Sequence, residues 1–150
     1  MELTKAEHGY RKEILQRLHR SRSIFWDHAI IGFTRRNWLP TSRDAERILE
    51  FMTVAGELEI IEGGKTLKNT DKGRLQYLFE RDGIIPDCPH YEFWKQIPEG
   101  FFTKTRLAEM GRRPFNLKKP DAKVYKKFDW SWIPLFKLEN SVEKISTTKN

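Results

Sequence analysis

Cys88 and His90 form the closest thiol–imidazole pair in the sequence, and they are the first candidates for chemistry. Residues two apart in an extended loop project in the same direction, so contact between the two side chains is possible. Nothing nearby predicts a third group to orient the imidazole, or an oxyanion site, as nucleophilic catalysis requires. A zinc site needs more ligands at closer spacing than one cysteine and four scattered histidines provide. We therefore expect no enzymatic activity, no metal and no cofactor.

Two further patterns do not predict a catalytic or nucleotide-binding site. Gly63-Gly64 is not followed by the Gly-Lys-Ser/Thr helix start of a phosphate-cradling loop. Glu57 and Glu59 could pair as acid and base, but they have no matching partners elsewhere, so we expect them to be surface charges. Binding is therefore a better hypothesis than catalysis.

The positive charge of the chain is concentrated in its second half. The formal net charge is +7, and residues 101–128 contain nine basic side chains against two acidic ones. Such a cluster neutralises phosphates and releases condensed counterions, which gives strong, salt-sensitive binding to nucleic acid. The alternative is that these side chains only solvate the surface. Apart from Lys123, the basic residues of this segment are our candidate contacts: Lys104, Arg106, Arg112, Arg113, Lys118, Lys119, Lys126 and Lys127.

Aromatic residues are interleaved with this basic segment. Basic grooves with aromatic platforms hold single strands by stacking bases, at about 1–3 kcal/mol per base. The alternative is that the aromatic side chains form a small hydrophobic core. The residues concerned are Phe101, Phe102, Phe115, Tyr125, Phe128, Trp130 and Trp132.

A second set of candidate contacts lies on a predicted helix over residues 42–55. Ser42, Arg43 and Arg47 fall on its outward side, and the two arginines are one turn apart. Arginine can grip guanine with two hydrogen bonds in the major groove. Glu46 and Glu50 lie beside them and would repel phosphates, so the alternative is a solvated face of Arg–Glu pairs.

Two smaller basic groups complete the set of candidate contacts. Arg35 and Arg36, together with Trp38, stand at the end of a predicted helix, where they could contact backbone phosphate. Lys65 and Lys68 lie on a predicted hairpin and could reach an adjacent groove or phosphate. Glutamates on the partner strand would weaken that contact.

The helices that position these residues follow from apolar spacing and caps. Apolar residues recur at helical intervals over residues 4–20, with Arg11 among the basic residues on the other faces, and again over residues 24–34. Thr41 with Asp44 resembles a capping box at the start of the third helix, and Gly56 suits a left-handed position at its end. Residues 58–61 and 65–69 predict two strands joined by Gly63-Gly64 in a tight turn. A fourth helix is predicted from Thr70 to Gly83.

This order, three helices followed by a hairpin and a helix, is the arrangement of a winged helix-turn-helix domain. SRDAERILEFMTVAGELEII (42–61) resembles the recognition helix and first wing strand of bacterial and phage winged-helix regulators. KTLKNTDKGR (65–74) is similar to the end of their wing, although Leu67 and Thr70 are two residues further apart than the family's Leu-Thr-x-x-Gly pattern. The resemblance covers residues 1–83 and implies an α+β fold and a DNA-binding regulator, and we predict a winged-helix domain over residues 1–85. Winged helices also serve as protein-docking modules.

Residues 86–139 are predicted to form a basic, aromatic-rich extension packed on that domain. It begins with a proline-rich loop, and Thr103 is placed to cap a short helix through Met110. Residues 123–128 and 134–138 predict two strands, joined through residues 129–132. GFFTKTRLAEMGRRP (100–114) is similar to a segment of small phage and mobile-element proteins. Residues 140–150 are predicted to be a flexible tail.

The composition of the chain predicts its location in the cell and the class of its binding partner. One cysteine predicts no internal disulfide and a reducing, cytoplasmic location. The polar N-terminus predicts no signal peptide, and no apolar run approaches the ~18 residues of a membrane span. We expect a non-enzymatic DNA-binding regulator or accessory factor, with RNA or single-stranded nucleic acid as possible ligands and a homodimer through the first helix as a possible assembly. The alternative is an adaptor that docks an acidic partner protein.

Overall fold

The computed structural model describes residues 2–37 and 39–144, and its fold is mixed α+β, as the sequence predicted. The chain divides into two compact units, and the boundary between them falls between Ile84 and Ile85. We call the segment through Ile84 unit 1 and the segment from Ile85 unit 2, and describe each by itself. The described residues do not include Met1, Trp38 or residues 145–150.

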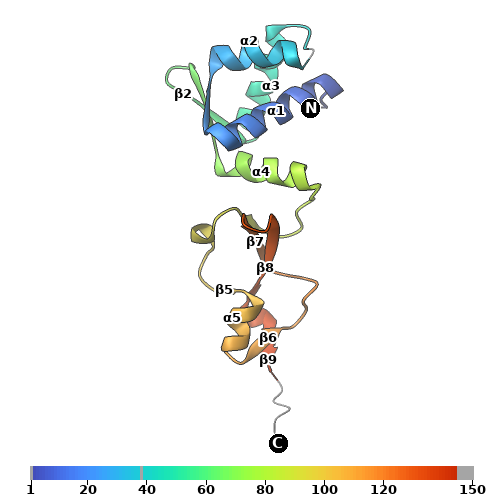
Figure 1. Ribbon diagram of the computed structural model, residues 1–150, viewed down its shortest axis with the longest axis vertical. Helices are drawn as coiled ribbons and strands as arrows, with labels where there is room; N and C mark the ends of the chain where they lie inside the picture. The colour runs from blue at the N-terminus through green and yellow to red at the C-terminus, as the bar shows by residue number, and fades with distance from the viewer. Residues whose placement is uncertain (1, 38, 145–150) are drawn as a thin grey trace, which may run out of the picture. The chain divides into compact units, whose positions relative to one another are not determined.

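Unit 1 consists of helices packed beside a small antiparallel sheet (Figure 1). In the sheet, β3 lies between β1 and β2. The β2–β3 hairpin follows α3 directly along the chain. The helices are α1 (Lys5–Ser21), α2 (Trp26–Arg36), α3 (Ser42–Val54) and α4 (Asp71–Asp82), and the strands are β1 (Ser23–Phe25), β2 (Leu58–Ile61) and β3 (Thr66–Asn69).

Strand β1 corrects the predicted helix over residues 24–34. Ile24 is buried and pairs with Leu67 of β3, whereas the neighbouring Phe25 is exposed. The helix begins only at Trp26, whose backbone N–H donates to the Lys65 carbonyl at 2.8 Å. The apolar spacing was compatible with a helix here, but hydrogen bonds to a strand 43 residues away decide the local structure.

The predicted caps are confirmed by hydrogen bonds. The Thr41 hydroxyl accepts from the Asp44 backbone, and the Asp44 carboxylate accepts from the Thr41 N–H at 3.1 Å, which completes the capping box of α3. Thr70 caps α4 by accepting from the Gly73 N–H at 3.0 Å. Gly56 has φ +78°, the left-handed conformation that a residue without a Cβ adopts most easily.

One hydrophobic core holds unit 1 together. Tyr10 and Ile14 of α1, Phe33 of α2 and Ile48 and Met52 of α3 are all buried within it. Leucines from the two strands of the hairpin join the same cluster. Burial of the predicted apolar stripe of α3 leaves the opposite side of this helix facing solvent.

The hairpin turns through residues with left-handed backbone. Gly63 (φ +67°) and Gly64 (φ +89°) confirm the predicted turn glycines, and Glu62 also has a positive φ of 55°. Lys65 belongs to the turn and not to the returning strand, which starts at Thr66. Lys65 therefore lies at the tip of the hairpin, where its side chain is exposed.

The described part of unit 2 contains one short α-helix, a four-stranded sheet and a two-stranded sheet. The central sheet has the order β4-β7-β8-β5, and β6 pairs with β9. Its core cluster consists of Ala122, Val124 and Leu135, with half-buried neighbours such as Ile133. The elements are β4 (His90–Tyr91), the 3₁₀ turn η1 (Trp94–Gln96), β5 (Phe101–Phe102), α5 (Lys104–Glu109), β6 (Arg112–Pro114), β7 (Ala122–Lys126), β8 (Ser131–Lys137), the 3₁₀ turn η2 (Leu138–Asn140) and β9 (Ser141–Glu143).

Sequence reasoning found the main hairpin of unit 2 but not its short strands. The predicted strands over 123–128 and 134–138 correspond to β7 and β8, with β8 starting three residues earlier because Ser131 pairs with Lys126. Thr103 caps α5 as predicted, with its hydroxyl accepting from the Arg106 N–H at 3.1 Å. Ser141–Glu143, placed by the sequence in a flexible tail, form β9 and pair with β6. Strands of two or three residues carry too little periodicity to be seen in sequence.

Candidate nucleic-acid interface

The outward side of α3 carries mixed charge. Ser42, Arg43, Glu46 and Glu50 are all exposed, because the buried stripe of the helix faces the core. Among the described residues, no ion pair to Arg43 is seen. Arg43 is therefore positioned to contact a ligand, but two carboxylates share its surface.

Arg47 is occupied by carboxylates of its own unit. Its guanidinium pairs with Glu7, whose side chain is 7% exposed, and lies 3.7 Å from the Asp44 carboxylate. The Glu7 carboxylate is also the N3 partner in the capping box of α1. Arg47 thus ties α3 to the start of α1, and its role differs from that of Arg43, although the sequence treats the two arginines alike.

The basic residues at the end of α2 also divide. Arg35 is exposed, whereas the Arg36 guanidinium pairs with Glu13 of α1 and lies 5.3 Å from the centre of the Phe33 ring.

On the hairpin, Lys65 and Lys68 are both exposed, and Lys68 stands opposite Glu59 in the strand register. Cross-strand neighbours of opposite charge attract each other, so Lys65 is the less compensated of the two.

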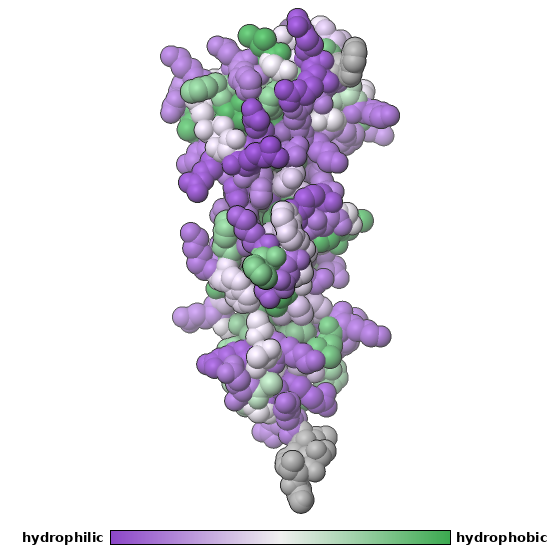
Figure 2. Space-filling view, in the orientation of Figure 1, coloured by the Kyte–Doolittle hydropathy of each residue, from purple (hydrophilic) through white to green (hydrophobic). Residues whose placement is uncertain are grey.

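Helix α1 presents a basic face that sequence reasoning missed. Lys5, Lys12 and Arg20 are exposed along one side of the helix. Its two carboxylates, Glu7 and Glu13, are engaged by Arg47 and Arg36, so neither offsets this side. The spacing of 5, 12 and 20 would have indicated a single stripe. In Figure 2, hydrophilic side chains dominate the visible face of unit 1, where α1 lies in Figure 1.

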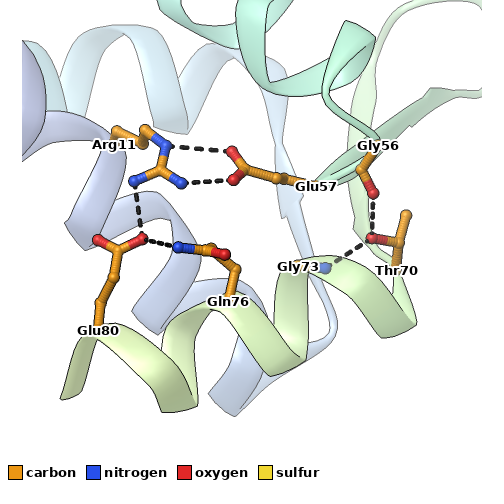
Figure 3. A network of polar contacts seen from close by, with 7 residues as sticks. All are labelled: Arg11, Gly56, Glu57, Thr70, Gly73, Gln76 and Glu80. Carbon is orange, nitrogen blue, oxygen red and sulfur yellow. Dashed lines mark hydrogen bonds and ion pairs between the residues drawn. The ribbon is translucent and has the colours of Figure 1, made fainter. Parts of the chain in front are cut away.

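A polar network ties Glu57, the residue directly before β2, to α1 and α4 (Figure 3). Arg11 of α1 donates to Glu57 at 3.1 Å and to Glu80 at 2.8 Å, and Gln76 donates to the same Glu80 oxygen at 2.8 Å. Burial alone would lower the pKa of Arg11, but its hydrogen bonds and attraction to Glu57 and Glu80 raise that pKa above its ordinary value. The prediction that Glu57 is a surface charge is therefore wrong. Arg11, which was predicted on a face away from the apolar one, is buried as well.

The basic residues of unit 2 separate into exposed and engaged groups. Arg112 donates to the hydroxyl and carbonyl of Ser141 at 2.7 and 2.9 Å, so it joins β6 to β9. Lys126 pairs with Asp129 at 2.9 Å, and Arg106 lies 3.8 Å from Glu109. Among the predicted contacts in the described part of unit 2, the exposed residues with no ion pair seen are Lys104, Arg113, Lys118, Lys119 and Lys127.

Both interpretations of the interleaved aromatic residues apply, each to a different subset. Tyr125 is buried and Trp132 half-buried, with ring centres 5.1 Å apart. Phe115, Phe128 and Trp130 are 74%, 88% and 68% exposed. Phe101 and Phe102 are half-buried, so the second group exposes the most ring surface on which a base could stack.

The Cys88–His90 pair has no thiol–imidazole contact among its hydrogen bonds. The Nδ1 atom of His90 lies 2.7 Å from the backbone carbonyl oxygen of Cys88 and therefore donates to it. Burial raises the pKa of the Cys88 thiol, which favours the weakly nucleophilic neutral form, and burial lowers the pKa of His90. Within the described residues, no three histidine, cysteine or acidic side chains gather as metal ligands would.

Comparisons with known proteins add no family to this picture. None of the helices in the described residues has the length and apolar character needed to cross a bilayer. No protein-family model, curated protein or solved structure matches the chain.

Proposed function

We propose that the protein is a non-enzymatic DNA-binding regulator or accessory factor, and that unit 1 is a winged helix. The order α1-β1-α2-α3-β2-β3-α4, with the hairpin directly after α3, supports this assignment. In such a domain α3 enters the major groove and the hairpin contacts the adjacent backbone.

The observation that carries the proposal is the exposed position of Arg43 on the first turn of α3. Its helix is capped by Thr41 and Asp44 and anchored by a buried stripe, so the first turn of α3 is held in place. Ser42 and Arg43 project from that turn into solvent. An arginine carried by a fixed helix start can read guanine with two hydrogen bonds, worth about 1–3 kcal/mol of discrimination.

Phosphate contacts would come from the exposed basic groups for which no ion pair is seen among residues 2–37 and 39–144. Lys65 at the hairpin tip and the exposed lysines of α1 supply them in unit 1, and the exposed basic residues around β6 and β7 supply them in unit 2. Each phosphate contact adds about 0.9 to the slope of log affinity against log salt.

Equilibrium binding tests this proposal directly. Duplexes selected from a randomised pool on the full chain should bind at ~50 mM salt and weaken steeply toward ~200 mM. Arg43→Glu should reduce the preference for selected over random duplexes by about 5- to 150-fold. Lys72→Glu makes the same change in net charge at an exposed site on α4, and should leave that preference intact. Absence of any DNA affinity at low salt would refute the proposal.

An acidic partner protein is the second candidate. Glu46 and Glu50 beside Arg43 would repel phosphates. In unit 2, Phe115 and Leu117 are 74% and 53% exposed next to exposed lysines; exposed apolar side chains offer a contact surface, and the lysines would attract an acidic partner. An adaptor of this kind would be indifferent to Arg43→Glu.

A further inference from the structure

The turn between β7 and β8 presents two aromatic side chains to solvent. Lys126 and Ser131 form the last pair of the hairpin, so residues 127–130 make the turn. Phe128 is 88% exposed and Trp130 is 68% exposed. Two large rings in a turn of four residues contribute little to the core of unit 2.

The base of this turn is ordered by its own contacts. Lys126 pairs with Asp129 at 2.9 Å across the turn. Directly beneath, Tyr125 pairs with Trp132 in the strand register with ring centres 5.1 Å apart, and His90 packs edge-on against Trp132 at 5.0 Å. An ordered base reduces the conformational entropy that the turn loses when it binds.

The backbone at Trp130 is in an unfavourable conformation for a tryptophan. Its φ is +56°, in the left-handed region that glycine and asparagine occupy readily and bulky residues rarely do. Trp130 is nevertheless 68% exposed. Backbone outliers of this kind cluster at active sites and ligand-binding sites.

We infer that this turn binds single-stranded nucleic acid, stacking unpaired bases on Phe128 and Trp130 while Lys127 contacts phosphate. The inference rests on the proposed nucleic-acid partner and specifies the strand state that unit 2 recognises. Asp129 is neutralised by Lys126, which leaves the Lys127 charge for the ligand. Asp129 also lies between the two aromatic residues, so insertion into a bilayer would carry a carboxylate with them, whereas base stacking leaves it in water.

Fluorescence anisotropy with the full chain and a labelled oligo-dT strand of roughly 20 nucleotides tests the inference, since such sites span about 4–16 nucleotides. Phe128→Ala and Trp130→Ala should each weaken binding by about 5- to 150-fold. Trp94→Ala provides the control, because Trp94 is an exposed tryptophan of the same unit, in η1. That control should bind with unchanged affinity.

Trp130→Gly separates binding from folding. Glycine suits a left-handed position, so this variant should unfold at the same or a higher denaturant concentration. It should nevertheless lose single-strand affinity to the same extent as Trp130→Ala. Retention of full affinity by the folded Trp130→Gly and Phe128→Ala variants would overturn the inference.

Two further measurements separate this inference from the proposed function. Duplex affinity, measured on the same samples, should be unchanged by the turn variants; if duplex binding is missing while single-strand binding depends on the turn, the role assigned to unit 1 fails and the inference stands. Vesicles of about 30% phosphatidylserine in phosphatidylcholine test the membrane alternative. Vesicle binding that depends on Trp130, with oligonucleotide binding unaffected, would overturn the inference.

Discussion

At the scale of single residues, Arg11 connects three segments of unit 1. Its side chain is 10% exposed and pairs with Glu57 and Glu80, which are 46 and 69 residues away in the chain. In a buried charge network of this kind, removing one member leaves the others uncompensated.

Arg11→Met should therefore destabilise unit 1 by about 3–5 kcal/mol, because the buried Glu57 carboxylate loses its counter-charge. Urea unfolding followed by circular dichroism measures the change. Arg43→Met is the matched control, since Arg43 is exposed, and its effect should stay within about 0.5 kcal/mol. Equal stability of the two variants would contradict the role given to Arg11.

Gly73 and Gly32 should respond in opposite ways to the same substitution. A Cβ on Gly73 would lie 1.9 Å from the Glu57 carbonyl oxygen, so Gly73→Ala must displace the start of α4 and should cost about 1–3 kcal/mol. A Cβ on Gly32 would meet the exposed His28 ring at 3.3 Å, which can move, so Gly32→Ala should gain up to about 1 kcal/mol in helix α2. Thermal unfolding of both variants checks the difference in sign.

His90 should make the stability of unit 2 depend on pH. Burial lowers the pKa of His90 below its ordinary value of 6.5; Lys123 lowers it further, whereas the Cys88 carbonyl and Asp87 raise it. The folded state then binds fewer protons than the unfolded state, so the stabilisation is complete above pH 6.5 and is lost as pH falls. NMR titration should give a pKa below 6.5, and His90→Asn should remove this component from urea unfolding measured between about pH 5 and 8. A titration at or above 6.5 would contradict it.

At the scale of elements, α1 illustrates how pairing redistributes charge. The helix has acidic and basic residues along its length, but its carboxylates turn toward Arg47 and Arg36. The face that remains exposed is basic, whereas the exposed face of α3 carries both signs. Phosphate contacts are therefore expected from α1, and discrimination between bases from the start of α3.

Lys12→Gln should lower the slope of log duplex affinity against log salt by about 1, because one phosphate contact is lost. The loss should be the same for selected and random duplexes. Lys72→Gln on α4 removes an equal charge and should leave the slope unchanged. If both variants behave alike, the basic face of α1 makes no specific contact with phosphate.

At the scale of the whole molecule, the two units differ in the size of their cores. Unit 1 buries Tyr10, Phe33 and many aliphatic side chains in one cluster, whereas the cluster in the described part of unit 2 centres on Ala122, Val124 and Leu135. Buried apolar area is the main source of stability, at about 25 cal/mol per Å². The units should therefore unfold separately, unit 2 first.

Hydrogen exchange of the full chain measures this difference. Amides of α1 and α3 should exchange more slowly than those of β7 and β8 by about tenfold or more, which corresponds to about 1.4 kcal/mol. The residues of unit 1 alone should retain the same protection. Uniform protection across both units would show a single cooperative structure instead.

The sequence by itself determined the features that depend on near neighbours. Thr41, Thr70 and Thr103 cap helices because their hydroxyls reach backbone N–H groups three residues away, and the Gly63-Gly64 turn needs only its own backbone freedom. The buried stripe of α3 follows from helical spacing. These contacts span only a few residues, so short segments of the sequence are enough to predict them.

The tertiary structure alone decided which charged and aromatic side chains remain available to a ligand. Arg11 and Arg47 look like Arg43 in sequence, but they pair with carboxylates at least 40 residues away. Trp130 and Trp132 are two residues apart, yet one is exposed in a turn and the other packs on Tyr125 and His90. The stability of a buried charge or ring depends on its partners. Those partners come from distant parts of the sequence and are brought together only by the tertiary fold.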